Sequence, residues 1–259
     1  YKESLDTKVA TLVEYNSSYP LEKKTDGYTN TLKPIISARY SPNKSKNARD
    51  DDKRINTNNV FSLNRLGLND SVEGGGSLSF GTEFYKTDFS NRDIFNAKIA
   101  NVFKYEEDKN LPDNSSLGKK TSDVMGYLSF NPSNFFNINY EFSQDENLKD
   151  TNFQLLKNEF KINNFVTTFE YLNQNNNVNK ESYLSNKTVY NFKKSNSFSF
   201  ETRENKETNA TEFYNLMYQY RNDCLIAAIQ YNKDYYTDRD LKPNESIYLN
   251  LTIIPFGQT

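Results

Sequence analysis

The chain has 259 residues, with 32 basic and 34 acidic side chains, one cysteine, and neither histidine nor tryptophan. Without an imidazole base, and with a single thiol, it can build no Ser-His-Asp or Cys-His catalytic group and no cysteine-rich zinc site. The formal net charge of -2 argues against a nucleic-acid binder, which normally carries a basic surplus. We therefore expect no enzyme, no cofactor, no metal and no nucleic-acid partner.

Apolar and polar residues alternate along most of the chain. Between residues 136 and 143, apolar side chains occupy the even positions and Asn, Glu or Ser the odd ones, and similar alternation recurs at 77–85, 214–221 and 247–253. Because successive side chains of a strand point to opposite faces, each such strand has one apolar and one polar face.

This pattern predicts about 13 strands, most of them near the ~9–11 residues that cross a bilayer when tilted. In chain order they are expected at residues 7–16, 30–40, 73–85, 93–104, 123–131, 135–144, 151–161, 165–174, 182–192, 196–204, 210–221, 224–236 and 245–255.

The connections between these strands alternate from residue 132 onward between tight turns and longer polar loops. Outer-membrane barrels have this asymmetry, with short periplasmic turns and longer outer loops. Residues 41–72 and 105–122 are therefore expected outside, and Cys224 at the periplasmic rim. By the same rule, 19–28 would be an unusually long periplasmic connection, which the rule does not explain.

The fold class predicted from these observations is all-β, an antiparallel transmembrane β-barrel. A soluble antiparallel sandwich is the alternative, but about 13 long strands in one sheet would curl or split. An odd strand count indicates part of a larger barrel. The polar residues expected to face its lumen are Asn137, Asn139, Glu141, Asn215, Gln219, Gln230 and Asn232, with Asn250 and Thr252.

Three consecutive acidic residues, 50–52, are hard oxygen ligands that could hold a metal ion. Basic residues flank them on both sides, which favours a solvated mixed-charge loop over residues 42–56.

Two stretches carry a family resemblance. Residues 59–85, which follow 32–42, and residues 214–257 resemble the C-terminal half of the LptD family of lipopolysaccharide-assembly outer-membrane proteins. The second stretch contributes the Asn222–Cys224 turn and the Asp238–Pro243 loop. The first contributes the family motif loop, formed by Asn64, Arg65, Gly67, Asp70, Glu73 and Gly74.

The resemblance implies that residues 1–259 are the C-terminal part of an outer-membrane barrel domain, about half of a 26-strand barrel, without its N-terminal periplasmic domain and first barrel half. It also implies that the barrel inserts lipopolysaccharide into the outer leaflet through a lumen and a lateral gate. The gate strand would be Ser246, Ile247, Tyr248, Leu249, Asn250, Leu251, Thr252, Ile253, Ile254 and Pro255.

Cys224 would form a disulfide with the missing N-terminal region, a pairing that the oxidising periplasm permits. The partners that the resemblance implies are lipopolysaccharide, outer-membrane lipid, an LptE-like plug lipoprotein, and periplasmic lipopolysaccharide-bridge proteins. A porin or plugged nutrient receptor, and a secreted β-fibre or adhesin, remain alternative functions.

Overall fold

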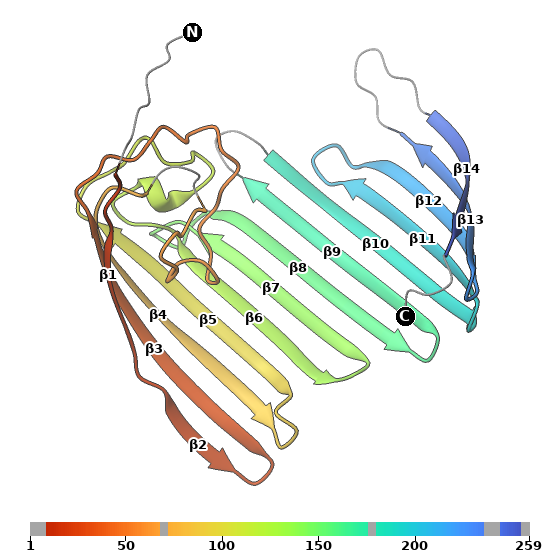
Figure 1. Cartoon of the computed structure of the whole chain (residues 1–259), viewed down its shortest axis with the longest axis horizontal. Coiled ribbons are helices and arrows are strands. Elements are labelled where there is room, and N and C mark those ends of the chain that lie inside the picture. Colours follow the sequence, from red (N-terminus) through yellow and green to blue (C-terminus); the bar gives the residue numbers. More distant parts are fainter. Residues whose placement is uncertain (1–8, 68–71, 176–179, 236–243, 255–259) are drawn as a thin grey trace. The chain divides into compact units, whose positions relative to one another are not determined.

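The computed structural model describes residues 9–67, 72–175, 180–235 and 244–254. Within this part the regular structure consists of β-strands and one short 3-10 helix, joined by loops (Figure 1). The elements are β1 (Val13–Ser18), β2 (Leu21–Thr25), β3 (Tyr28–Ser41), β4 (Gly75–Asp88), β5 (Asp93–Lys104), the short 3-10 helix η1 (Ser116–Gly118), β6 (Val124–Ser133), β7 (Phe136–Gln144), β8 (Thr151–Ile162), β9 (Phe165–Asn175), β10 (Lys180–Lys193), β11 (Asn196–Asn205), β12 (Ala210–Arg221), β13 (Leu225–Asp234) and β14 (Asn244–Ile253).

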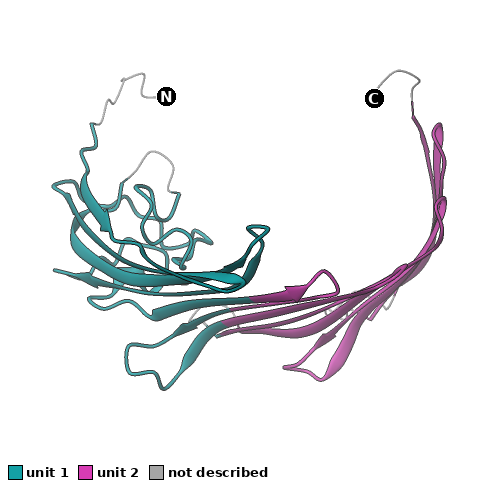
Figure 2. Cartoon of the chain, turned by 90° about the horizontal axis from the view of Figure 1, so that it is seen from below, with its two compact units in different colours: residues 1–129, 141–153, 175–179 teal, residues 130–140, 154–174, 180–259 magenta. Residues whose placement is uncertain are grey.

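The strands form one 14-stranded antiparallel sheet in which β1 and then β3 to β14 follow one another in sequence order, while β2 pairs with β3. This confirms the all-β class. Among the described strands, β1 and β14 stand at the two ends of the order, so closure into a barrel is not shown. The chain divides into two compact units, residues 1–129, 141–153 and 175–179 (unit 1) and residues 130–140, 154–174 and 180–259 (unit 2) (Figure 2).

Strands β3 to β14 agree with the predicted spans to within a few residues at each end. The first predicted strand, 7–16, is wrong in its bounds, because β1 begins at Val13. The connection expected at 19–28 is also wrong: it contains β2 and a two-residue hairpin turn.

β1 and β2 together act as one interrupted strand along the edge of β3. Ser18 of β1 pairs with Ile35, and Leu21 of β2 pairs with Leu32. Both strands advance by three residues between these two pairs, so the antiparallel register is the same before and after the break. The break lies at Pro20, which has no N–H to donate to the ladder. The turn that follows places Gly27 at φ 104°, a left-handed conformation that glycine adopts without strain. The alternation of tight turns and longer connections therefore begins at the start of the described chain.

Asparagine supplies the left-handed positions of several other turns, because its side chain tolerates this conformation better than most. Asn91, Asn163 and Asn209 have φ between 51° and 56°. Leu148 also has a positive φ, and its turn is held by the Asp145 carboxylate, which accepts hydrogen bonds from the backbone N–H groups of Lys149 and Asp150.

The core of unit 1 is built by loops rather than by two packed sheets. The described parts of residues 42–74 (the 42–74 loop) and residues 105–123 (the 105–123 loop) lie on one side of the strands of this unit (Figure 2). Their apolar side chains pack with those of β5 and β6 into one buried cluster. Its members are Ala48, Ile55, Val60, Leu66, Ala100, Val102, Leu111, Leu117 and Met125, with Phe61 packed against them.

Candidate functional site

The face of unit 1 that the loops cover is the one rich in serine and charge. Its buried polar residues include Ser37, Arg39, Ser77, Ser79 and Lys104 (the polar face). In a soluble sheet protein the covered face would be the apolar one, because burying apolar surface drives folding. On β3 and β4 the sequence alternates in the usual way, but the buried and exposed sides are exchanged. On β5 the covered face is mixed, because Ala100 and Val102 of the buried cluster lie beside Lys104.

The opposite face of unit 1 is exposed and apolar. Strands β3, β4 and β5 carry on it Leu32, Ile36, Leu78, Phe80, Ile99 and Phe103, each between 41% and 47% exposed (the apolar face). A contiguous apolar surface of several strands is rare on a soluble monomer and marks contact with a protein or a membrane. The apolar face therefore requires an apolar partner. Hydrocarbon is an apolar environment that could cover all strands of this face.

Aromatic rings of unit 2 lie side by side on the apolar side of β10, β11 and β12. The centroids of Tyr190 and Phe192 are 6.2 Å apart, and those of Phe192 and Tyr218 are also 6.2 Å apart. These rings lie toward the tight turns that end β10 and β12. Rows of aromatic side chains of this kind flank the lipid-facing band of outer-membrane barrels.

A buried ion cluster joins the 42–74 loop to the polar face of β4 and β5. The Arg65 guanidinium donates to both carboxylate oxygens of Glu73, at 3.0 Å and 2.5 Å, and Lys104 Nζ lies 3.1 Å from the same carboxylate. Arg65 also donates to the hydroxyls of Ser77 and Ser79, at 2.9 Å and 3.0 Å. These contacts satisfy a fully buried guanidinium with four hydrogen bonds, which keeps the cost of its burial low.

The charge state of Glu73 follows from these neighbours. Burial by itself raises the pKa of the Glu73 carboxyl, but Arg65, Lys104 and Arg39 together hold that pKa below its ordinary value of 4.5. Glu73 is therefore ionised at neutral pH and binds the cations around it.

The other residues of the family motif have backbone roles in the same loop. Asn64 O accepts from Gly67 N at 3.2 Å, and Gly67 has φ 58°, so this turn favours glycine. A Cβ on Gly74 would lie 2.2 Å from the Asn43 carbonyl oxygen, so only glycine fits there. Asp70 lies outside the described residues. The structure places Arg65 and Glu73 of the predicted motif in one buried cluster, while the contacts with Ser77, Ser79 and Lys104 were not predicted from the sequence.

A second anchor of the 42–74 loop is the Phe61 ring. A Cβ on Gly81 of β4 would lie 2.7 Å from this ring, so the ring rests directly on the glycine backbone. Sequence reasoning missed this contact. A glycine within an alternating strand was its signal, because such a glycine often marks a close approach.

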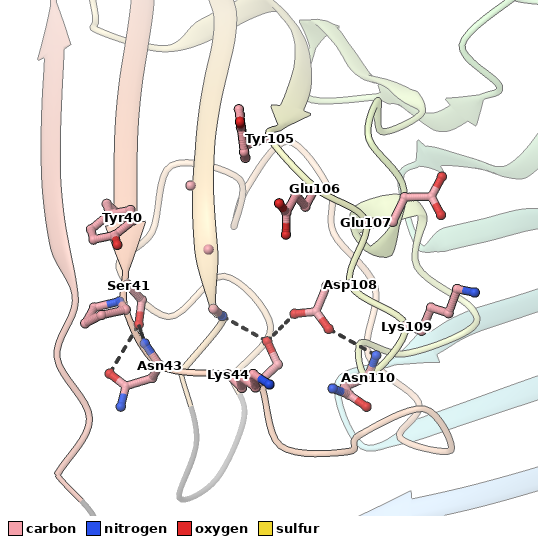
Figure 3. A pocket seen from close by; sticks show the side chains of 15 residues that line it. Tyr40, Ser41, Asn43, Lys44, Tyr105, Glu106, Glu107, Asp108, Lys109 and Asn110 are labelled. Atoms are coloured by element: carbon pink, nitrogen blue, oxygen red, sulfur yellow. Dashed lines mark hydrogen bonds between the residues drawn. The ribbon is translucent and has the colours of Figure 1, made fainter.

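At the end of β3, β4 and β5, the two loops enclose an open pocket of about 650 Å³ (Figure 3). Ser45 connects its walls: its hydroxyl donates to Asp108 and accepts from Gly74 N at 2.9 Å. Asp108 in turn accepts from Asn110 N at 3.1 Å. These bonds tie the start of the 42–74 loop to the 105–123 loop, so the two loops form a single cover.

In the mixed-charge part of the 42–74 loop, several charged side chains pair with residues of other segments. Arg49 lies 2.9 Å from Asp113, Arg54 lies 3.2 Å from Glu141, and Asp52 accepts from Asn114 at 2.5 Å. Within the part of the chain that the structure describes, no cluster of three His, Cys, Asp or Glu side chains could hold a metal ion.

The predicted polar residues of unit 2 share one face. Between β12 and β13, Asn215 pairs with Asn232, Met217 with Gln230 and Gln219 with Ala228. Ala228 also pairs with Asn250 of β14. Paired residues of neighbouring strands lie on the same side, so β12, β13 and β14 present these side chains together. In β7, Asn139 donates to Asn137 at 2.5 Å, while Glu141, in unit 1, meets Arg54 of the loop cover.

Residues 246–253 of the predicted gate strand lie in β14, while Ile254 follows the end of β14 and Pro255 lies outside the described residues. The alternate β14 residues Ile247, Leu249, Leu251 and Ile253 are between 64% and 79% exposed. Cys224 lies in the tight turn before β13, where Asn222 Oδ1 accepts from the N–H groups of Cys224 and Leu225. Its thiol is free and partly buried, so a disulfide is not shown.

None of the helical structure in the described residues is long and apolar enough to span a membrane. Among protein families, the model described as LptD, LPS transport system D, matches residues 2–203. The chain belongs to the LptD family. This is a lipopolysaccharide-transport family of the outer membrane and not an enzyme family.

The LptD match includes the 59–85 stretch, with the motif loop and its ion cluster, and it extends over residues 86–203, where only the strand pattern indicated the family. It ends before the 214–257 stretch, so the resemblance of the Asn222–Cys224 turn lies beyond the matched residues. The loop at 238–243 also lies outside the described residues. No curated protein matches the chain.

Proposed function

We propose that the chain forms part of the wall of an outer-membrane barrel that passes lipopolysaccharide to the outer leaflet through a hydrated lumen and a lateral gate. The observation that carries this proposal is the exchange of faces in unit 1, where polar residues are buried under loops and apolar residues are exposed. Bilayer hydrocarbon covers the apolar face, and the polar face lines the lumen.

Closure of the barrel is part of the proposal. Unpaired backbone groups at a sheet edge are costly in lipid, so the free edges of β1 and β14 need partner strands. We assign those strands to the first half of the barrel. The edge of β14 is then one side of the lateral gate.

Amphipathic cargo explains why such a gate is needed. The saccharide of lipopolysaccharide requires water and its acyl chains require hydrocarbon, so a molecule that moves along the lumen must leave sideways through the wall. LptD membership favours this role over a porin, a nutrient receptor or a secreted fibre.

The gate can be tested in cells with full-length protein. A cysteine at Asn250, combined in turn with single cysteines along the first strand of the barrel, should form a disulfide across the closed gate. The crosslinked protein should stop the arrival of new lipopolysaccharide at the cell surface, and reduction should restore it. Normal surface lipopolysaccharide with a fully crosslinked gate would refute the proposal.

The partners are tested separately. Crosslinkers placed at Gln219 and Gln230 should capture an LptE-like plug lipoprotein, while those at Leu216 should not, because Leu216 lies on the other face of β12.

Mass mapping of mature full-length protein should find Cys224 joined to a cysteine of the N-terminal region. A thiol that remains alkylatable in the mature protein would exclude that disulfide.

A further inference from the structure

A separate polar pocket lies beneath the 42–74 loop, on the polar face of β1, β3, β4 and β5. It has a volume of about 300 Å³, at the lower end of the range for small-molecule sites. It shares none of its lining residues with the buried ion cluster. Six residues matter for its chemistry, namely Lys33, Thr57, Asn58, Phe61, Glu83 and Lys98.

Glu83 is the centre of the charged side of the pocket. Lys33 Nζ and Lys98 Nζ lie 3.4 Å and 3.8 Å from its carboxylate, and Tyr85 Oη donates to it at 2.8 Å. Lys98 also donates to Asn58 Oδ1 at 3.3 Å. An ammonium has three protons to donate, so both lysines keep donors for a ligand, and the carboxylate keeps acceptor capacity.

Thr57 supplies the second, independent observation. Only 6% of this residue is exposed, it lines the pocket, and its hydroxyl has no hydrogen-bond partner in the protein. A buried hydroxyl without a partner destabilises the fold, so buried polar groups are almost always satisfied. The residue lines the pocket although its oxygen is itself buried, so a rotation of the side chain would bring the hydroxyl to a ligand that both donates and accepts hydrogen bonds.

The combination of groups selects a class of ligand. The pocket offers ammonium donors, a carboxylate and an amide oxygen as acceptors, a hydroxyl that can do either, and the apolar surface of Phe61. Two lysines against one carboxylate also attract an anion, but an anion would leave the Glu83 and Asn58 acceptors and the Phe61 surface unused. An apolar ligand would leave the charges unsatisfied. A sugar ring presents hydroxyls around its edge and C–H groups on its faces, which matches both kinds of group.

We propose that this pocket binds a sugar ring of a saccharide that lies along the polar face. The proposal deepens the proposed function and rests on it for the choice of saccharide, since that face would be the wall beside which the saccharide of lipopolysaccharide moves. Thr57 and Glu83 hold ring hydroxyls, and Phe61 contacts the ring.

The test uses purified full-length protein in detergent and the water-soluble saccharide obtained by removing all acyl chains from lipopolysaccharide. Saturation-transfer NMR and calorimetric titration should show saturable binding to the wild type. Thr57→Val keeps the side-chain shape but removes the hydroxyl, and Glu83→Gln removes the charge. Each should weaken binding by about fivefold, the loss of one hydrogen bond. Thr82 lies in β4 beside Glu83 but on the apolar side of that strand, so the control Thr82→Val should bind like the wild type.

The outcomes separate the possibilities. Equal affinity of Thr57→Val and wild type overturns the proposal, as does the absence of saturable binding to the wild type. Full competition by inorganic phosphate, with no binding of a dephosphorylated saccharide, would make this a phosphate site and overturns the sugar assignment. Retained binding of the dephosphorylated saccharide supports it.

Failure of the function and of the pocket can be told apart. If gate crosslinking blocks surface lipopolysaccharide while the saccharide does not bind, the pocket assignment alone is wrong. If the saccharide binds but gate crosslinking has no effect, the transport proposal is wrong and the sugar site stands. Heat-modifiable gel migration checks that each variant is folded, and the isosteric Thr57→Val keeps the test decisive if Glu83→Gln does not fold.

Discussion

At the scale of single residues, one carboxylate controls how the 42–74 loop is held. Glu73 is the anion for both Arg65 and Lys104, and their side chains are 7%, 0% and 2% exposed. A buried ion pair adds little stability over apolar residues of the same shape, but removing one partner leaves uncompensated charge. The cluster therefore fixes the position of the loop more than it adds to the stability of the fold.

Glu73→Gln should destabilise the protein by about 3–5 kcal/mol, because it leaves two buried cations without their anion. The matched control is Glu204→Gln, which breaks the Lys206–Glu204 pair, whose side chains are 34% and 41% exposed. That loss should be about 0–1 kcal/mol. Urea unfolding of full-length protein, followed by heat-modifiable migration, measures both, and equal losses would contradict this account.

Acidification should remove the contribution of Glu73. Its pKa in the folded protein is held below the ordinary value of 4.5, so its stabilising effect is complete above that pH and is lost as the pH falls through the folded pKa. The stability difference between wild type and Glu73→Gln should therefore shrink below pH 4.5. Measuring the stability of both proteins over the same pH range isolates Glu73, because the carboxylates that both proteins share affect them equally. A stability difference that does not change with pH would show that Glu73 is not the ionising group.

At the scale of elements, the loop cover depends on glycines that let other groups approach the strands. Gly81 receives the Phe61 ring, and Gly74 lies under the Asn43 carbonyl. Both could be recognised as unusual in the sequence, but their partners are 20 and 31 residues away, in a loop with no periodic pattern. Sequence reasoning therefore predicted β4 and not what packs on it.

Gly81→Ala should displace Phe61 and loosen the 42–74 loop, because the added Cβ would lie 2.7 Å from both the ring and the Ile99 carbonyl oxygen. The control is Gly76→Ala in the same strand, where the nearest atoms would be 3.8 Å away. Limited proteolysis and hydrogen exchange should show faster cleavage and exchange within residues 42–67 for Gly81→Ala only. Unchanged protection of the loop would show that Phe61 is not an anchor.

At the scale of the whole molecule, the exchange of polar and apolar faces decides the environment in which the protein works. Under the proposed function, the apolar face of unit 1 meets lipid and the polar face under the loops meets a hydrated interior. LptD membership gives this arrangement its transport role.

Leu249→Arg should impair assembly into the membrane, because a cation on the lipid side of a barrel strand costs about 2–4 kcal/mol near the bilayer centre. Asn250→Arg, on the other face of the same strand, should be tolerated. The level of heat-modifiable protein in outer-membrane fractions measures both variants. Equal assembly of the two would show that β14 does not separate lipid from water.

The sequence by itself determined the strands, their faces and the turn chemistry, because alternation with period two and left-handed Asn or Gly positions are local properties of the chain. It also singled out Arg65 and Glu73 as family-motif residues, and the structure adds that they form a buried ion pair. Its main error, at 19–28, came from reading the interruption at Pro20 as the end of a strand, although the pairing with β3 continues beyond it.

Only the tertiary structure decided which face is buried, and with which partners. Alternation alone is the same whether the apolar side meets a protein core or lipid. Strand length and loop pattern predicted the lipid arrangement, but only the structure shows loops packed on the polar face of unit 1. Lys104, Phe61 and Thr57 gain their roles through contacts between segments that are distant in sequence, and no local pattern encodes such contacts.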